Sequence, residues 1–434
     1  MKDREIKVAI CVLGGCLLVF YGAISYALEI FPYRIVMPPV VAAKAVGELL
    51  SIEEYSNDSR WVADVPEKTG MFLKKPGEYE SRYTLYVSTN DTTARLLNED
   101  GETLHQWSLS FNKIWPDAAQ VNSLFPLDDS YFYLRDFHLY PNGDLLLMVS
   151  AGGVTPWGMG LVKLDKDSQV LWKYTGYVNN DFDVAPDGSI YVIEHEIRED
   201  KPEKVDEIFL PFLEDNIVHL DPDGQEIDRF SLLDALGQSD YAALLKRIVD
   251  DGKGDPTHTN SVRYILDDHP EVSWLKKGYL LLSIRNIDAF AVVDPAEKKV
   301  VYAAGMPTRH QHDIELRADG NFMVFDNRGD VHGDDYTRVL AFKPDTQEAV
   351  WQHDLDAQGG QMHSKFWGQD QQLSNGNVFI VYAEKGQMFE VNERGETVWA
   401  YNTPLYKLID GTKRVATITS AARIPMDYIA FDLK

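Results

Sequence analysis

The stretch HDIELRADGNFMVFDN, residues 312–327, reads as two short strands on either side of an Asp-Gly pair. Asp-Gly and Asn-Gly pairs favour the tight turns of β-hairpins. The same pattern recurs as DFHLYPNGDLLLMVS (136–150), DFDVAPDGSIYVIEH (181–195) and QDQQLSNGNVFIVYA (369–383), and a stretched copy covers 258–286. A repeated hairpin is therefore the building unit of this chain.

A second type of hairpin carries an aromatic residue late in its last strand, as in RVLAFKPDTQEAVWQH (338–353). Six copies occur, at 94–107, 160–174, 216–230, 289–304, 338–353 and 387–401. One hairpin of each type makes a four-stranded unit, and six units predict an all-β, six-bladed β-propeller. The first unit lacks its first strand. We expect the strand-like segment 416–431 to supply it and to close the ring.

Composition excludes several classes of function. The chain of 434 residues has a formal net charge of -26, which argues against a nucleic-acid partner because phosphate binding needs a basic face. Its two cysteines, Cys11 and Cys16, both lie near the N-terminus. The globular part therefore has neither a disulfide framework nor a cysteine nucleophile.

The N-terminus carries an apolar, uncharged run from Val8 to Leu28, preceded by three basic residues. About 20 such residues span a bilayer, so the run predicts an N-terminal transmembrane helix with the remainder exported. A cleaved signal peptide ending at Ala27 is the alternative. We expect an anchor or signal over 1–32, a partly helical linker over 33–78, and the propeller over 79–434 with a helical insertion at about 231–252.

One face of the predicted propeller gathers the polar candidates. The start of each first strand and the end of each second strand meet there, beside the central channel. The residues placed on this face by their strands are Arg135, Asn180, His258, Asn260, Arg285, Asn286, His312 and Asn327, and its loops carry Trp157, His332, His363 and Trp367.

These residue types suit an oxyanion better than a metal ion. A single histidine at a strand end is commonly a turn residue, but an arginine, two histidines and an asparagine that converge favour an anion site. Arginine offers a planar fork of donors, and histidine can act as nucleophile or acid. The histidines lack paired metal-ligand spacing, and no G-x-S-x-G elbow, phosphate loop or dinucleotide fingerprint occurs, so we expect no metal and no cofactor.

The motifs HTNSV, LLLSIRN, QHDIELRADGNFMVFDN and AARIPMDY, in this order, resemble those of the bacterial arylsulfate sulfotransferases. The resemblance extends from about Thr84 to Tyr428. It implies a six-bladed propeller on the periplasmic side of the inner membrane. It also implies transfer of a sulfuryl group from an aryl sulfate to a phenolic or other hydroxyl acceptor, through a sulfohistidine and without a nucleotide donor.

Site roles follow from the resemblance residue by residue. The nucleophile is His312, and His258, Arg285 and Asn260 hold the sulfuryl oxygens and assist the leaving phenolate. Where the family has a His-His-Asp stretch, this chain reads Asn179-Asn180-Asp181. Asparagine donates a hydrogen bond but no proton, so the leaving group needs another acid, for which His195, His332 and His363 are candidates.

Two further residues complete the predicted substrate site. Asn286 follows Arg285, and Trp157 or Trp367 is a candidate to stack an aryl ring. The expected partners are a small aryl sulfate, a hydroxyl acceptor and the membrane. Two alternatives stay open at this point: a non-catalytic membrane-tethered scaffold propeller, and a hydrolase or lyase that acts on an anionic polysaccharide.

Overall fold

The computed structural model describes residues 21–22, 25, 61, 65–116, 129–152, 156, 158–205, 208–248, 254–327, 336–355, 363–409 and 411–433. The chain divides into two compact units, Met1–Ser56 and Asn57–Lys434. All the described strands lie in the second unit.

The described residues contain no helix that is long and apolar enough to cross a bilayer. The predicted transmembrane helix over 8–28 is therefore not supported. Of that stretch, only Tyr21, Gly22 and Ser25 are among the described residues.

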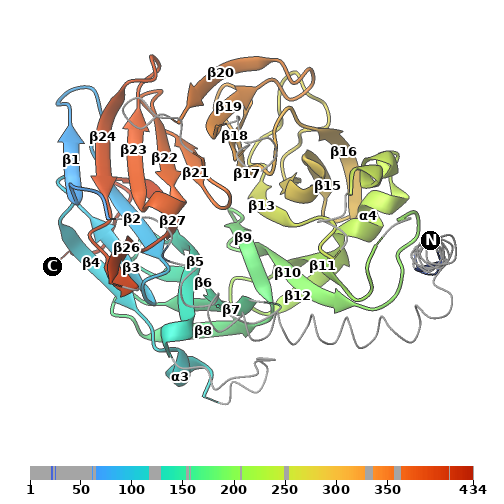
Figure 1. Ribbon diagram of the computed structural model, residues 1–434, viewed down its shortest axis with the longest axis horizontal. Coiled ribbons are helices and arrows are strands. Elements are labelled where there is room, and N and C mark those ends of the chain that lie inside the picture. The colour runs from blue at the N-terminus through green and yellow to red at the C-terminus, as the bar shows by residue number, and fades with distance from the viewer. Residues whose placement is uncertain are drawn as a thin grey trace, which may run out of the picture. The chain divides into compact units, whose positions relative to one another are not determined.

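Six sheets of the second unit surround a centre (Figure 1), and each is a blade whose strands follow one another antiparallel. Blades one to three, inner strand first, are β27 (Ile418–Pro425), β2 (Arg82–Ser88), β3 (Thr93–Leu97) and β4 (Thr103–Ser108); β5 (Phe132–Leu139), β6 (Leu145–Ala151), β7 (Gly158–Leu164) and β8 (Val170–Thr175); and β9 (Val178–Val184), β10 (Ile190–Arg198), β11 (Phe212–Leu220) and β12 (Glu226–Ser231).

Blades four to six repeat this order around the ring. Their strands are β13 (Thr259–Tyr264), β14 (Leu280–Ile284), β15 (Ala289–Asp294) and β16 (Lys299–Gly305); β17 (His312–Leu316), β18 (Phe322–Asp326), β19 (Arg338–Phe342) and β20 (Ala349–Asp354); and β21 (Gln369–Gln372), β22 (Val378–Tyr382), β23 (Gln387–Val391) and β24 (Thr397–Asn402). The predicted all-β, six-bladed propeller is confirmed.

The chain ends close the ring as expected. The C-terminal strand β27 pairs antiparallel with β2 and is the inner strand of blade one, with Leu85 opposite Ala422. The other end contributes a strand that the sequence pattern did not reveal. This strand, β1 (Gly70–Lys74), lies in the stretch expected to be a linker and pairs with β24 as a fifth strand of blade six.

The hydrophobic core consists of six clusters, and each fills the space between two neighbouring blades. Successive side chains of a strand point to opposite faces, so a strand between two blades must be apolar on both. In β6, Leu145, Leu147 and Val149 pack toward blade one, whereas Leu146 and Met148 pack toward blade three. This two-sided burial explains the run LLLMV in the sequence.

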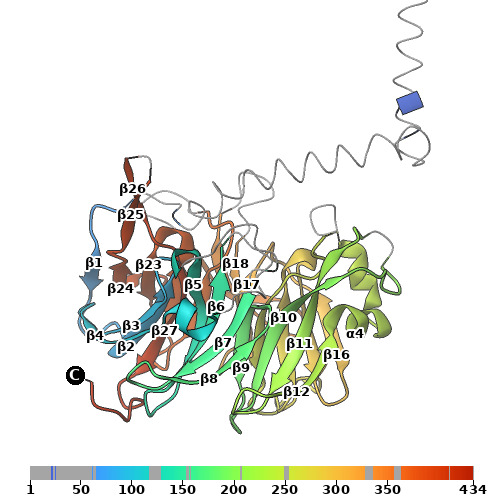
Figure 2. The same ribbon diagram turned by 90° about the horizontal axis from the view of Figure 1, so that it is seen from below.

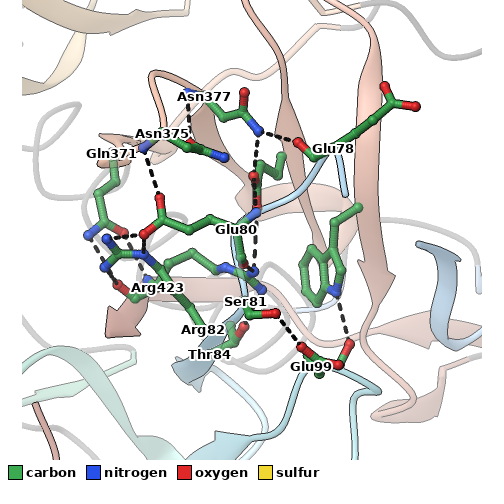
Figure 3. Close-up of polar contacts among 12 residues, drawn as sticks. Glu78, Glu80, Ser81, Arg82, Thr84, Glu99, Gln371, Asn375, Asn377 and Arg423 are labelled. Carbon is green, nitrogen blue, oxygen red and sulfur yellow. Dashed lines mark hydrogen bonds and ion pairs between the residues drawn. The ribbon is translucent and has the colours of Figure 1, made fainter. Parts of the chain in front are cut away.

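A polar network joins blades one and six where the ring closes (Figure 3). Arg423 of β27 is fully buried, and its guanidinium donates to Thr84 Oγ1 at 3.1 Å and to the Glu80 carbonyl at 2.5 Å. It also lies 3.4 Å from the Glu390 carboxylate of β23. Because this one side chain contacts two segments far from it in sequence, 80–84 and Glu390, it ties the C-terminal strand to both neighbours.

The connections between blades carry the remaining elements. The stretch expected to be a helical insertion contains α4 (Leu232–Gln238) and the 3-10 helix η2 (Ala242–Arg247). Helix α4 packs its leucines into the core between blades three and four. Short helices α3 (Phe111–Ile114), η1 (Asp129–Tyr131), η4 (Arg285–Ile287) and η5 (Ala383–Lys385) lie in other loops, and the hairpin of β25 (Tyr406–Ile409) and β26 (Thr412–Val415) projects from one face (Figure 2).

Candidate functional site

The inner strands are irregular at one level of the channel. Their pairing register shifts in five of the six blades, at Arg135 of β5, Asn260 of β13 and Thr419 of β27, and within the first residues of β9 and β17. A β-bulge re-aims a side chain that regular pairing would send into the blade. The bulges therefore turn this set of side chains toward the channel.

Backbone conformation at the same level is also unusual. Asn180, Asp313 and Trp367 have φ angles of 67°, 54° and 59°. Non-glycine residues rarely adopt these values, and such positions concentrate at functional sites. At the neighbouring Gly368 a Cβ atom would lie 2.2 Å from the Phe325 ring, so only glycine fits there.

These residues enclose a small cavity in the channel. Its lining comprises Arg135, Asn180, Asp181, Asn260, His312, Asp313, Trp367, Gly368, Gln369 and Thr419. The centre of a water molecule has about 20 Å³ of it available. A cavity of this size has room for a compact group.

His312 stands at the start of β17 and is 5 % exposed. Its Nδ1 lies 2.7 Å from Asn327 Oδ1 and 3.1 Å from the His310 carbonyl. The Asn327 amide nitrogen donates to the carbonyls of Ser364 and Trp367, so its oxygen faces the imidazole. Two acceptor oxygens require the proton on Nδ1, which leaves the lone pair on Nε2.

The surroundings of His312 favour its neutral form. Burial lowers its pKa well below the usual range, and the positive charges of Arg285, His258 and Arg135 lower it further. The bond to Asn327 opposes this effect without reversing it. The Trp367 backbone N–H reaches Nε2 at a long 3.3 Å, so the lone pair is only weakly engaged. His312 is a neutral imidazole with an available nitrogen.

His258, Arg285 and Asn286 form a second cluster beside this cavity. His258 Nδ1 lies 2.5 Å from Asp255 Oδ2, and both side chains are about one fifth exposed. Arg285 donates to the Asn286 side-chain oxygen at 2.7 Å, and the Asn286 amide donates to the Asp255 carbonyl at 2.6 Å. The structure therefore brings together three residues that the sequence predicted for this site, and adds Asp255.

Arg135, Asn180 and Trp367 form the opposite wall. Arg135 Nη2 donates to Asn180 Oδ1 at 3.1 Å, and its guanidinium carbon lies 4.8 Å from the centroid of the Trp367 ring. The Asn180 amide donates to the Thr259 carbonyl at 2.8 Å. The indole face toward Arg135 is thus occupied, so an aryl ring on Trp367 would have to use another part of the indole.

Asn260 has a defined orientation. Its amide nitrogen donates to the Gln311 carbonyl at 2.7 Å, and its buried side-chain oxygen has no partner among the described residues. An unpaired acceptor beside the cavity suits a hydroxyl donor on a ligand. The remaining amide hydrogen stays available for an anion.

Two other predicted residues, His195 and His363, do not line this cavity. His195 is buried, contacts Asn179 at 2.9 Å and lies 3.0 Å from Asp215. Burial disfavours its charged form, but the Asp215 carboxylate outweighs this and raises the pKa of His195. His363 is exposed. Trp157 and His332 lie outside the described residues.

An acidic layer lies below the cavity. Arg263 bonds to both Asp181 and Asp313, whose pKa values burial raises above their usual range. Asp181 also accepts the Val262 N–H, and Asp313 accepts the Asp370 N–H, so these carboxylates join neighbouring blades. No three His, Cys, Asp or Glu side chains within the described ranges are placed to hold a metal ion.

Sequence comparison decides the family. The family model described as Arylsulfotransferase (ASST) matches residues 136–403, more than half of the chain. The chain belongs to the arylsulfotransferase (ASST) family. This confirms the family indicated by the motifs, and it supports aryl sulfotransferase activity in general on small aryl substrates.

Solved structures match this arylsulfotransferase-family chain at low identity. A Bacteroides caccae protein of unknown function is 13 % identical, and the match covers 80 % of this chain and 99 % of that one with a TM-score of 0.49. A virginiamycin B lyase from Staphylococcus aureus is 9 % identical over 64 % and 73 % of the two chains, with a TM-score of 0.38. No curated protein matches the sequence.

Three residues of the arylsulfotransferase site went without a role in the sequence interpretation. Arg135 and Asn327 were placed on the correct face, but a bulge and an inter-strand contact decide what they do. Asp255 was missed. Its position three residues before His258 was the one available signal, because a short turn can bring such a carboxylate to the imidazole.

Proposed function

We propose that this chain transfers a sulfuryl group from an aryl sulfate to a hydroxyl acceptor through a sulfohistidine at His312. The observation that carries the proposal is the state of His312. It is neutral, its Nδ1–H is held by Asn327, and its Nε2 lone pair borders a cavity that also contains Arg135. A nitrogen nucleophile needs this state.

In the first step, Nε2 of His312 attacks the sulfur of the donor, and the bond from sulfur to the phenolic oxygen breaks. The His258–Asp255 pair lies next to Arg285, whose backbone N–H contacts the His258 carbonyl at 3.3 Å. His258 in its protonated form supplies a proton to the leaving phenolate. Arg285 offsets the negative charge that develops on the oxygens.

In the second step, the acceptor hydroxyl gives its proton to His258, and its oxygen attacks sulfur as the bond to Nε2 breaks. We assign Asn260, which lines the cavity and whose Oδ1 has no partner among the described residues, to accept from that hydroxyl before transfer. Both steps leave His312 and His258 as they began. The proposal therefore needs neither a nucleotide donor nor a metal.

The test uses 4-nitrophenyl sulfate as donor and phenol as acceptor. We expect 4-nitrophenol release that depends on phenol, and a sulfuryl adduct on His312 by mass spectrometry when phenol is omitted. His312→Asn should lower the rate by more than about 10³-fold and abolish the adduct. His353→Asn on the outer strand β20 is the matched control and should retain both.

Other outcomes would favour the alternatives. Absence of adduct and turnover across many aryl sulfates would support a binding or scaffold propeller. Turnover with water at the same rate as with phenol would support a hydrolase. Adduct formation that survives His312→Asn would refute the assigned nucleophile.

We also propose that the propeller works on the periplasmic side of the membrane, tethered by the segment 8–28. The apolar run and the preceding basic residues support this. Determination of the N-terminal residue of the mature protein tests it. A protein that begins after residue 27 would replace the anchor by a cleaved signal peptide.

A further inference from the structure

Arg135 is a buried cation in the cavity. The residue is only 8 % exposed. Among the described residues, no carboxylate lies within ion-pair distance of its guanidinium. Its recorded contacts are the Asn180 oxygen and the Trp367 ring. A buried charge without a counter-ion is costly, and burial accordingly lowers the pKa of Arg135. Guanidinium nevertheless keeps its proton at neutral pH.

The other buried arginines of the described chain are each paired with a carboxylate. Arg82 lies 2.5 Å from the Glu80 carboxylate, and Arg423 lies 3.4 Å from the Glu390 carboxylate. Both belong to the network that closes the ring (Figure 3). Arg135 differs from them because it faces a cavity and pairs with a neutral amide.

The carboxylates near Arg135 are already engaged. Asp181 and Asp313 line the same cavity, but both bond to Arg263 on its lower side. Asp136, the next residue along β5, accepts the Ser420 hydroxyl at 2.7 Å. The Asn180 oxygen and the Trp367 ring hold the guanidinium in place without neutralising it. The Asp136 and Asp181 carboxylates favour the charge of Arg135 only from beyond ion-pair distance, so an anion that enters the cavity is the first negative group in direct contact with the guanidinium.

We infer that Arg135 binds the compact anionic group of the substrate next to His312, and that Asn180 is the residue that positions it. Arg135, Asn180 and His312 line one cavity, and its small volume suits a compact group. The Asn180 oxygen fixes the guanidinium at 3.1 Å, and the guanidinium keeps further N–H donors for an anion.

This inference rests on the proposed function for the identity of the anion, because a sulfate ester is a compact monoanion. A phosphate ester has the same shape and differs in charge, since its second pKa is about 6. Methyl sulfate and methyl phosphate are therefore matched probes. At about pH 8 the first carries one charge and the second carries two.

The experiment is calorimetric titration of the full chain with each probe at constant ionic strength. We expect methyl sulfate to bind, and methyl phosphate shows whether an anion of the same shape and higher charge binds as well. Arg135→Gln should weaken methyl sulfate by about 10- to 100-fold, which corresponds to loss of charged hydrogen bonds. Asn180→Asp should weaken it similarly, because a carboxylate then pairs with Arg135 although the arginine is intact. Arg229→Gln removes an equal charge from the outer strand β12 and should bind as the wild type.

The outcomes separate the two proposals. If methyl sulfate binds equally to the wild type and Arg135→Gln, or to neither, the role of Arg135 is refuted. If methyl phosphate binds and methyl sulfate does not, the anion site does not take the sulfuryl group of the proposed function. If binding depends on Arg135 but no donor transfers a sulfuryl group, the proposed function fails and the anion site stands. Urea unfolding of each variant excludes loss of folding as the cause.

Discussion

Asp255→Asn is expected to slow the enzyme in a way that depends on the leaving group. In the proposed mechanism, His258 protonates the departing phenolate, and Asp255 stabilises the protonated imidazole. The two side chains meet at 2.5 Å, which is a charge-assisted contact. Asparagine preserves an oxygen acceptor at this position and removes the negative charge.

The magnitude follows from the exposure of the pair. Two unit charges about 4 Å apart interact by about 4 kcal/mol at an effective dielectric constant of about 20. His258 and Asp255 are 21 % and 18 % exposed, so solvent reduces the effect. A difference of about 1–2 kcal/mol between a charged and a neutral hydrogen bond is a reasonable measure. It corresponds to about a 5- to 30-fold loss of kcat.

The assay compares two donors. Phenyl sulfate releases a basic phenolate that needs a proton, whereas 4-nitrophenolate leaves without one. Asp255→Asn should therefore lower kcat for phenyl sulfate by the stated factor and change kcat for 4-nitrophenyl sulfate by less than about threefold. An equal loss with both donors, or none with either, would refute His258 as the acid. The backbone carbonyl that accepts Asn286 is kept, so the fold should survive.

Three further predictions concern pH and packing. Burial and the Arg285 charge lower the pKa of His312, so kcat/KM should not fall between about pH 8 and 6 through protonation of this group. The same shift means that the stability of the fold decreases as the pH drops below the unfolded pKa of about 6.5. A loss of kcat/KM through protonation of His312 near that pH would contradict the neutral nucleophile. Burial, and then the Asp313 charge, raises the pKa of Glu315 to about 8, so the stability that Glu315 contributes is present at acidic pH and is lost as the pH rises toward 8. Glu315→Gln should therefore flatten the fall in melting temperature between about pH 5 and 8. An unchanged slope would exclude Glu315 as the source of that fall. Gly368→Ala places a Cβ 2.2 Å from the Phe325 ring, and Phe325 pairs with His312, so we expect a loss of about 1–3 kcal/mol in urea unfolding together with reduced transfer; wild-type values for both would contradict the contact.

The role of Arg135 shows the limit of reading function from strand position. The alternation of side chains along the strands predicts that Arg135 lies at the channel face, and it predicts the same position for His312 and Asn327. The pairing of β5 with β6, however, is interrupted at Arg135 by a bulge, and Arg135 lines the cavity there. A bulge adds one residue to a strand without a distinctive sequence, so its position could not be predicted.

Local physical chemistry alone determined the architecture. Turn pairs at regular intervals, alternating strands and runs such as LLLMV specify hairpins whose two faces must both be buried, and six such units close into a ring because closure removes exposed edges. The order of the motifs in the sequence indicated the family, and the resemblance implied His312 as the nucleophile.

Only the tertiary structure decided the chemistry of the site. The protonation state of His312 depends on Asn327 from the neighbouring strand, on burial, and on charges from Arg285 and His258 of blade four and Arg135 of blade two. Arg135 has no carboxylate within ion-pair distance among the described residues, because Asp181 and Asp313 are bonded to Arg263 and Asp136 accepts from Ser420. Burial, electrostatic fields and the choice of partners are properties of positions in space. A linear sequence contains the residues but does not contain these distances.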